Sequence, residues 1–212
     1  MKPAAERGLT ARGKARHAGA RLPAGERRST LIDAALVVFS TGSYSGATTA
    51  QIAREAGVSE PILYRHFGSK RDLYLACLDE AWEEFHEEAT LALAEDPAGC
   101  LGVISDRYMA KGAKFRLVDL WIQALTEASD DPVIAKALRR QIRGLHDFLA
   151  GVIRDGQHRG VVNEDRDPEA EAWIFLGGGL LATMDARLGG LLGDDMQRVR
   201  HERRRWMLSE TA

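Results

Sequence analysis

The sequence contains little cysteine and little proline, and it has no long apolar run. Its 212 residues include 2 cysteines and 6 prolines, and the longest nearly uninterrupted apolar segment, from Trp173 to Met184, has 12 residues. Because a membrane helix needs about 20 apolar residues, we expect no contact with a membrane. The basic N-terminal segment also lacks the apolar stretch of a signal peptide, which favours a cytoplasmic location.

The two cysteines have neither the spacing of a metal site nor that of a redox motif. We therefore expect a reducing compartment in which Cys77 and Cys100 act as small core residues. A redox-sensing pair is the alternative that the sequence leaves open.

Motifs of catalysis are also lacking. The 6 histidines form no His-Glu-x-x-His pattern, and no serine or cysteine lies in a nucleophile motif. His86 lies in a run of glutamates, which is typical of a solvated helix face. The glycine triplet Gly177–Gly179 follows no strand, so it is not a phosphate-binding loop. We expect no catalytic residue, no metal and no cofactor, and a small helical enzyme is only a remote alternative.

The composition favours an all-α fold. Helix-forming Ala, Leu, Glu and Arg are abundant, no alternating strand pattern is found, and a hydrophobic content of 45% excludes wholesale disorder. Asp-Pro pairs mark three of the predicted helix starts. The predicted helices span residues 26–41, two short segments that begin near 48 and 59, and then 69–94, 97–111, 115–129, 132–158, 168–190 and 194–208.

The segment from Thr48 to Leu73 has the residue types of two short helices joined by a tight turn. Thr48 is a good N-cap, and Gln51 three residues later can complete a capping box. Gly57 can adopt the left-handed conformation that ends a helix, and Val58 can then pack against both helices. This arrangement is typical of a helix-turn-helix.

The second short helix has one face suited to DNA. Ser59 can cap it, and Pro61 falls in its first turn, where a missing N–H costs least. Leu63 and Phe67 are four residues apart and point inward. The residues that are turned wholly or partly outward are Glu60, Pro61, Tyr64 and Arg65. An exposed tyrosine and arginine suit a phosphate backbone.

TTAQIA at residues 48–53, followed by AGVSEPILYRHFGSKRDL at residues 56–73, resembles the DNA-binding domain of the TetR family of bacterial transcriptional regulators. The resemblance covers about residues 27–75 and is specific, because it combines a turn glycine, a cap and two aromatic positions at fixed spacing. It implies that Thr48 and Thr49 hold phosphates at the start of the first short helix. It also implies that Tyr64, His66 and Lys70 hold the DNA backbone, and that Glu60, Pro61 and Ile62 face base edges. With Ser59 and Arg65, these residues make up the predicted DNA-binding set.

Charge is distributed unevenly along the chain. Counting Lys and Arg against Asp and Glu, residues 1–28 carry a net charge of +6, residues 29–75 are neutral, and the remainder carries −8. A basic end followed by an acidic body is expected when one end meets a polyanion. Residues 1–25 have no helical periodicity, so we predict a disordered arm. It is either a solvated tail or an arm that contacts DNA beside the recognition helix.

The helix predicted at 69–94 connects the DNA-binding segment to the rest of the chain. Ser69 and Asp72 have capping-box spacing at its start. Its apolar residues form a stripe wide enough for more than one neighbour: Leu73, Tyr74, Cys77, Leu78, Ala81, Trp82, Phe85 and Ala89. Because it belongs to both parts, we expect it to transmit movement of the body to the DNA-reading end.

Two features of the body indicate helix packing. Within 132–158, Leu138, Ile142, Leu145, Leu149 and Val152 have the spacing of a seam against a nearly parallel or antiparallel partner. The triplet Gly177–Gly179 lies inside a helical apolar segment, where it costs about 2 to 3 kcal/mol relative to alanines. We expect either close approach at a helix–helix interface or a broken or kinked helix. The family resemblance favours the interface, between two subunits of a homodimer.

A ligand pocket is suggested by aromatic and polar residues of the body, although each alone is better explained by core packing. The candidates are Phe85, Tyr108, Trp121, His146, Phe148 and Trp173.

The expected domains are the arm at 1–25, a three-helix helix-turn-helix domain at 26–75 and a helical effector-binding and dimerisation domain at 76–212. The expected function is a repressor that binds a palindromic operator in double-stranded DNA as a dimer. A small apolar or aromatic effector would release it. An architectural DNA-binding protein without an effector is the alternative.

Overall fold

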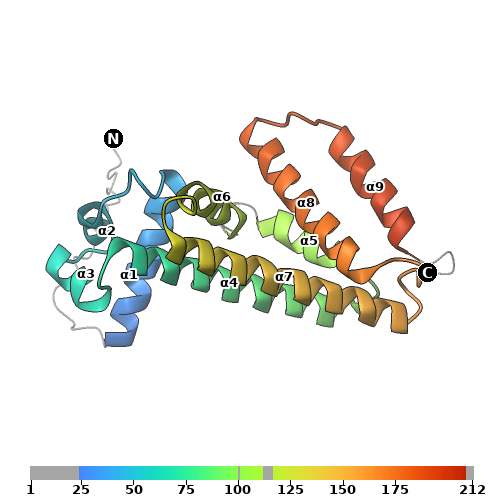
Figure 1. Cartoon of the computed structure of the whole chain (residues 1–212), viewed down its shortest axis with the longest axis horizontal. Coiled ribbons are helices and arrows are strands. Elements are labelled where there is room, and N and C mark those ends of the chain that lie inside the picture. The colour runs from blue at the N-terminus through green and yellow to red at the C-terminus, as the bar shows by residue number, and fades with distance from the viewer. Residues whose placement is uncertain (1–23, 100, 112–116, 209–212) are drawn as a thin grey trace, which may run out of the picture.

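The computed structural model describes residues 24–99, 101–111 and 117–208. This part of the chain is helical, so the all-α prediction is confirmed. The elements in Figure 1 are α1 (Ala24–Thr41), α2 (Thr49–Glu55), α3 (Glu60–His66), α4 (Lys70–Glu95), the short 3-10 helix η1 (Pro97–Gly99), α5 (Leu101–Lys111), α6 (Leu117–Glu127), α7 (Pro132–His158), α8 (Pro168–Arg187) and α9 (Asp195–Met207). The predicted arm lies almost entirely outside the described residues.

Two long helices set the length of the molecule. α4 and α7 pack along each other, α1 to α3 gather at one end of α4, and α8 packs on α7 (Figure 1). The α4 stripe predicted from the sequence is buried except for Trp82, which is partly buried. The seam of α7 is also confirmed, since Leu138, Leu145 and Leu149 are at most 5% exposed.

The helix-turn-helix forms through the local signals in its sequence. The Thr48 hydroxyl accepts from the Gln51 N–H, and the Gln51 side chain accepts from the Thr48 N–H at 2.9 Å, so the capping box is complete. Gly57 has a φ of +68° and turns the chain into α3. Ser59 occupies the N-cap position of α3, but its side chain makes no capping hydrogen bond. Pro61 lies in the first turn, as expected.

Replacing Gly57 by alanine should lower the free energy of unfolding by about 1 kcal/mol, because an L-residue is strained in the left-handed region. A Cβ added there meets no atom within 4 Å, so no steric clash would contribute. Gly151 is the matched control: it also has open space around its Cβ position, but it lies inside α7. Gly151→Ala should raise the free energy of unfolding by about 0.5 to 1 kcal/mol. Urea denaturation of both variants would refute this account if the two changes had the same sign.

The helix starts marked by Asp-Pro pairs differ in outcome. Asp131 and Asp167 cap α7 and α8 by accepting from backbone N–H groups, with Pro132 and Pro168 in the first turns. Pro97 instead begins only the 3-10 turn η1, and the α-helix follows from Leu101. The helices predicted at 115–129, 168–190 and 194–208 are each slightly shorter in the structure. α8 ends at Arg187, because Gly189 and Gly190 adopt positive φ.

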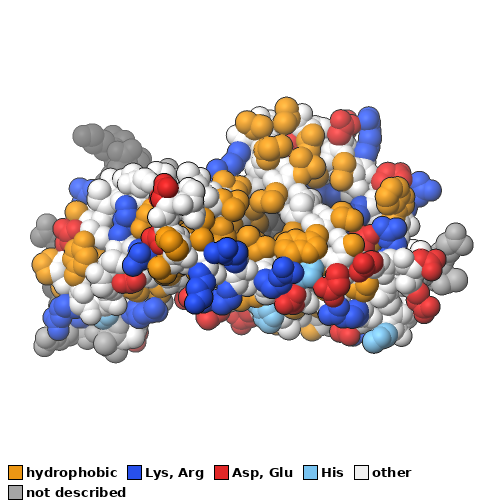
Figure 2. Space-filling view, viewed as in Figure 1, with side chains coloured by type: hydrophobic (Ala, Val, Ile, Leu, Met, Phe, Trp, Pro, Cys, Tyr) orange, Lys and Arg blue, Asp and Glu red, His pale blue; other side chains and the backbone are white. Residues whose placement is uncertain are grey.

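α8 and α9 expose much apolar surface. Along α8, exposed positions recur at spacings of four, three, four and four residues: Trp173, Gly177, Leu180, Met184 and Leu188. Part of this surface lies among the hydrophobic side chains at the upper edge of the molecule in Figure 2. No described helix is long and apolar enough to cross a membrane.

α8 continues as one helix through the glycine triplet. The alternative of a broken helix is therefore wrong. A Cβ added at Gly177 or Gly179 would meet no atom within 4 Å, and one at Gly178 would lie 3.7 Å from the Arg203 side chain. Within one described chain, then, no neighbour requires these glycines.

Candidate nucleic-acid interface

α2 packs against α1, α3 packs against α2, and the two short helices leave a polar outer surface. Ile52, Ala53 and Leu63 are at most 2% exposed, and Phe67 is 4% exposed. On the other side, Thr48, Ser59, Pro61, Tyr64 and Arg65 are exposed, whereas Glu60, Ile62 and His66 are partly buried. The inward and outward faces of α3 therefore agree with the sequence pattern. The DNA contacts themselves remain predictions.

Three residues of the predicted DNA-binding set form a hydrogen-bonded cluster between α2 and α3. The Thr49 hydroxyl donates to Glu60 Oε1 at 2.5 Å and lies 3.1 Å from the Tyr64 hydroxyl. Thr49 itself is only 8% exposed. In this structure it positions the two residues beside it on α3, a role that the sequence pattern did not indicate.

Lys70 is held by the loop before α2. Its Nζ donates to the carbonyl oxygens of Tyr44 at 2.9 Å and Ala47 at 3.2 Å, and it lies 4.5 Å from the centre of the Tyr44 ring. This ammonium group therefore fixes the α1–α2 loop to the start of α4. Any contact with phosphate would be made by a side chain that is already oriented.

An aromatic cluster joins the helix-turn-helix to the body. Tyr74 of α4 is fully buried, its ring lies edge-on to Phe39 at 4.9 Å, and its hydroxyl donates to the Leu120 carbonyl of α6 at 2.7 Å. The centre of the Tyr44 ring lies 4.8 Å from that of the Tyr74 ring. Burial raises the pKa of Tyr74, so its hydroxyl keeps its proton well above neutral pH. The pKa of the nearby Cys77 thiol is also raised by burial, which fits the predicted core role.

Polar contacts from α6 and the start of α7 reach the same end of the molecule. Gln123 Nε2 donates to the Phe39 carbonyl at 2.7 Å, and the Ser45 hydroxyl donates to Glu127 at 2.6 Å. Arg71 pairs with Asp131 at 3.2 Å. These links were not predicted from the sequence, because they join residues 60 or more positions apart and have no motif.

The predicted pocket residues are distributed among several packing contacts. Trp121 is buried and donates to Gln141 at 3.0 Å, while Phe85 is 6% exposed. The ring of Phe148 lies 4.8 Å from that of His86, and buried His146 stacks on Trp173 at 4.4 Å. Trp173 is 43% exposed. The side chain of Tyr108 lies outside the described part of the chain.

His146 has two acidic neighbours, and one of them, Glu169, has another partner. Its Nδ1 lies 2.9 Å from Asp147, and its Nε2 lies 3.1 Å from the Glu169 carbonyl and 3.6 Å from the Glu169 carboxylate. These atoms are close enough for a shared ion. However, the Glu169 carboxylate also pairs with Arg154, so the cluster is satisfied by protein groups.

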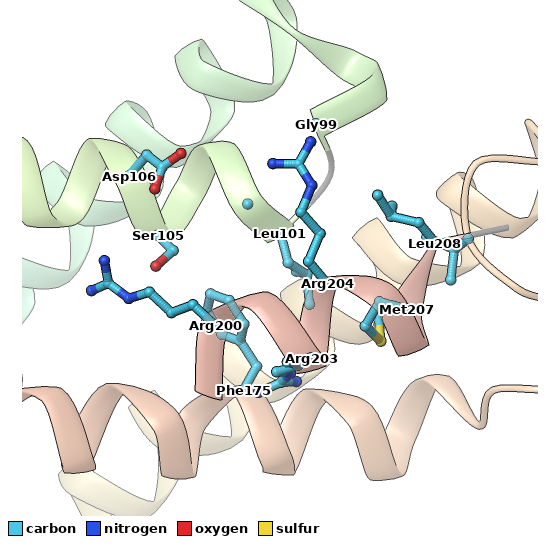
Figure 3. A pocket seen from close by; sticks show the side chains of 12 residues that line it. Gly99, Leu101, Ser105, Asp106, Phe175, Arg200, Arg203, Arg204, Met207 and Leu208 are labelled. Atoms are coloured by element: carbon cyan, nitrogen blue, oxygen red, sulfur yellow. The ribbon is translucent and has the colours of Figure 1, made fainter. Parts of the chain in front are cut away.

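A cavity of about 160 Å³ lies among α5, α8 and α9 (Figure 3). Its walls combine apolar side chains, including Leu101, Val162 and Phe175, with Arg200, Arg203 and Arg204 of α9. None of the five pocket candidates with described side chains lines it. The aromatic candidates of the body lie elsewhere, because their rings pack between helices.

Comparisons with known proteins match both parts of the chain. Residues 31–77 match the model of the bacterial regulatory proteins of the tetR family, and residues 104–177 match the C-terminal model of BetI-type transcriptional repressors. The chain belongs to the TetR family. Both models describe regulators rather than enzymes, in agreement with the expectation from the sequence.

Two curated TetR-family relatives show how far the similarity extends. The transcriptional activator FasR of Mycolicibacterium smegmatis is 53% identical over 60 residues, which cover 28% of this chain and 27% of FasR. The regulator BetI of Brucella abortus is 30% identical over 126 residues, 58% of this chain and 64% of BetI. The chain therefore spans less than two thirds of either relative.

Solved structures of the TetR fold match nearly the whole chain. A putative transcriptional regulator from Saccharomonospora viridis, crystallised with choline, has a TM-score of 0.73 and 20% identity over 88% of this chain and 100% of its own. Regulatory protein TetR from Rhodobacter sphaeroides has a TM-score of 0.71 and 22% identity, over 85% of this chain and 98% of its own. At these sequence identities, the similarity to the solved structures shows a shared fold and no more.

Proposed function

We propose that this TetR-family protein is a ligand-responsive DNA-binding transcriptional regulator that acts as a homodimer on a palindromic operator. The observation that carries the proposal is the arrangement of α3. Its inner face is buried, and its outer face presents Tyr64 and Arg65 at the end of the three-helix unit. An exposed tyrosine and arginine on a second helix of this kind suit contact with the major groove and its phosphates.

The exposed apolar stripe of α8 supports the homodimer. Its five positions run from Trp173 to Leu188, with Gly177 among them. Such a stripe, with spacings of three and four residues, suits a helix packed against another helix. A second copy of α8 would also allow the close backbone approach that offsets the cost of the glycines. Two half-sites in DNA require two recognition helices.

Control by a ligand would act through the contacts that join the body to α1–α3. The buried Tyr74 ring and the hydrogen bonds of Gln123 and Glu127 connect α6 to that end of the molecule. A ligand that prefers one arrangement of the body would change the spacing of the recognition helices by population shift. A coupling of about 1 to 3 kcal/mol is enough for a useful switch.

We infer repression as the direction of control. The support is the match of residues 104–177 to a C-terminal model of transcriptional repressors, although the relative FasR is named as an activator. An effector-independent architectural role is the second candidate. The cavity among α5, α8 and α9 favours a ligand-responsive regulator, because an architectural protein does not need a ligand cavity.

The test is selection of bound genomic fragments by the full-length protein, followed by affinity measurements at several salt concentrations. We expect enrichment of palindromic sites and an affinity that falls steeply with salt, as phosphate contacts require. Uniform recovery of fragments would contradict the proposed operator recognition. An operator whose occupancy raises transcription would contradict repression alone.

Substitutions on α3 should separate base reading from phosphate binding. Glu60→Ala should change the preferred operator sequence, because a carboxylate can accept from a cytosine amino group. Arg65→Ala should weaken all operators by about tenfold and reduce the salt dependence. Arg139→Ala, an exposed arginine on α7, is the charge-matched control and should change neither property. Equal binding of every operator variant by Glu60→Ala would remove Glu60 from base reading.

A further inference from the structure

The cavity among α5, α8 and α9 has a chemistry that the regulator function does not yet explain. A dimerisation helix needs an apolar face, yet α9 carries five arginines in 13 residues. Two of them have acidic partners on the helix itself: Arg198 pairs with Asp195, and Arg205 pairs with Glu202. The other three line the cavity.

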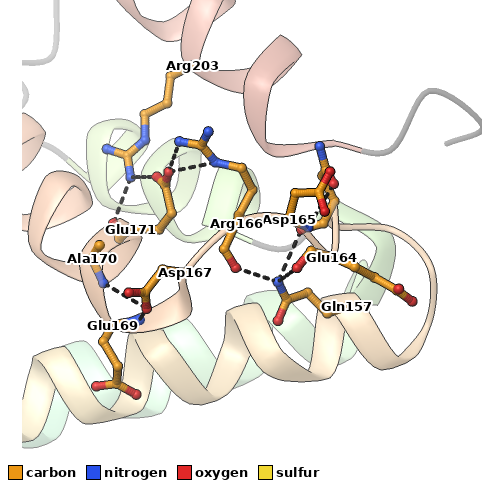
Figure 4. A network of polar contacts seen from close by, with 10 residues as sticks. Gln157, Glu164, Asp165, Arg166, Asp167, Glu169, Ala170, Glu171 and Arg203 are labelled. Carbon is orange, nitrogen blue, oxygen red and sulfur yellow. Dashed lines mark hydrogen bonds and ion pairs between the residues drawn. The ribbon is translucent and has the colours of Figure 1, made fainter.

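The positive charge beside the cavity is only partly neutralised. Arg203 contacts the buried Glu171, with its Nη2 2.9 Å from the Glu171 carbonyl and 3.5 Å from the carboxylate. Arg166 binds the same carboxylate, so one glutamate serves two guanidinium groups (Figure 4). Burial lowers the pKa of Arg203, and the proximity of Glu171 opposes this effect.

Arg200 and Arg204 have no ion partner among the described residues. Asp106 is the one acidic side chain among the described residues that line the cavity. Against it stand three lining arginines, so these described groups carry a net charge of +2. Adding Arg166 and Glu171 behind them leaves the same excess. A guanidinium group without an anionic partner can donate hydrogen bonds to a carboxylate or a phosphate.

The cavity also has an apolar part. Leu101, Val162 and Met207 are at most 7% exposed, and Phe175 adds an aromatic face beside them. Figure 3 shows the Arg200 and Arg204 side chains extending from α9 on the side of α5, whereas Phe175 and Arg203 lie toward α8. A ligand here would thus meet guanidinium groups and a hydrophobic wall together.

We propose that this cavity binds a compact organic anion with one apolar group, such as an aryl or short-chain carboxylate. The volume of about 160 Å³ suits one ring, since a cavity of about 150 Å³ can take up benzene. A quaternary ammonium is disfavoured, because such cations are recognised by cages of several aromatic rings. The described residues that line this cavity offer one aromatic ring and three cations. The inference rests on the proposed function in so far as this ligand would be the effector.

The test is calorimetric titration of the full-length protein, without DNA, with probes that differ in the head group. The anions are benzoate, phenylacetate and hexanoate, and the matched cation and neutral molecule are phenyltrimethylammonium and benzyl alcohol. We expect the carboxylates to bind at least tenfold more tightly than the cation. Arg200→Ala should weaken carboxylate binding about tenfold, as loss of a charge-assisted hydrogen bond implies. Arg204→Ala, nearer the surface, should have a smaller effect.

Arg198→Ala is the matched control, since it removes an arginine from the same helix outside the cavity, and it should leave carboxylate binding unchanged. The proposal is overturned if no carboxylate binds at millimolar concentration, if the cation binds as tightly, or if Arg198→Ala weakens binding as much as Arg200→Ala. Operator binding is measured separately. Carboxylate binding by a protein that ignores DNA would refute the regulator function alone, and operator binding without carboxylate binding would refute only this inference.

Discussion

A charge placed at Leu180 should convert the protein to a monomer and abolish its binding to a palindromic operator. Leu180 is 45% exposed and lies at the middle of the apolar stripe of α8. In a homodimer formed through this stripe, Leu180→Asp would bury two unpaired carboxylates, one from each subunit. Each uncompensated polar burial costs several kcal/mol. Because 1.4 kcal/mol is a factor of ten, the dimer Kd should rise by at least about 100-fold.

The loss of operator affinity should be of similar size, because a monomer presents one recognition helix to a site that has two halves. Analytical ultracentrifugation would measure the oligomeric state, and mobility shift would measure operator binding. Leu91→Asp is the matched control: Leu91 is 48% exposed, but it lies on α4, away from the stripe. It should leave the dimer and its DNA affinity intact. A Leu180→Asp protein that stayed dimeric would place the interface elsewhere.

The elements that depend on neighbours in sequence were predicted well. The capping box of Thr48 and Gln51, the positive φ of Gly57 and the Asp-Pro starts of α7 and α8 all involve residues within four positions of one another. Helical periodicity also identified the buried stripe of α4, because a continuous helix fixes which residues share a face. The exception at Pro97 is physical as well: a proline permits a helix start but does not supply the residues that continue it.

The contacts between distant segments were not predictable in this way. Gln123 reaches the end of α1 across 84 positions in the sequence, and no motif marks it. The cavity brings Phe175 of α8 together with arginines of α9 and with α5. The aromatic residues of the body were candidates for its lining because large rings suit both pockets and cores. In the structure most of those described pack against other side chains, and the cavity wall combines apolar side chains with three arginines of α9.

The second large effect is expected at Tyr74, where the DNA-binding end meets the body. Tyr74→Ala should lower the free energy of unfolding by about 3 to 5 kcal/mol, as loss of a fully buried aromatic side chain does. Tyr74→Phe keeps the ring and removes only the hydrogen bond to the Leu120 carbonyl, so it should cost about 1 kcal/mol. Chemical denaturation of both variants separates the contribution of ring packing from that of the hydroxyl.

Tyr64, ten positions earlier, provides the contrast that tests both assignments. It is 49% exposed on α3, so Tyr64→Ala should change the free energy of unfolding by less than about 0.5 kcal/mol but weaken all operators by about tenfold. Tyr74→Phe should have the opposite pattern, with a measurable loss of stability and nearly normal DNA affinity at low temperature. If Tyr64→Ala were as destabilising as Tyr74→Ala, the hydrogen-bonded cluster with Thr49 and Glu60 would be holding α2 and α3 together. The two tyrosines thus distinguish a surface that binds DNA from a joint that keeps that surface attached to the body.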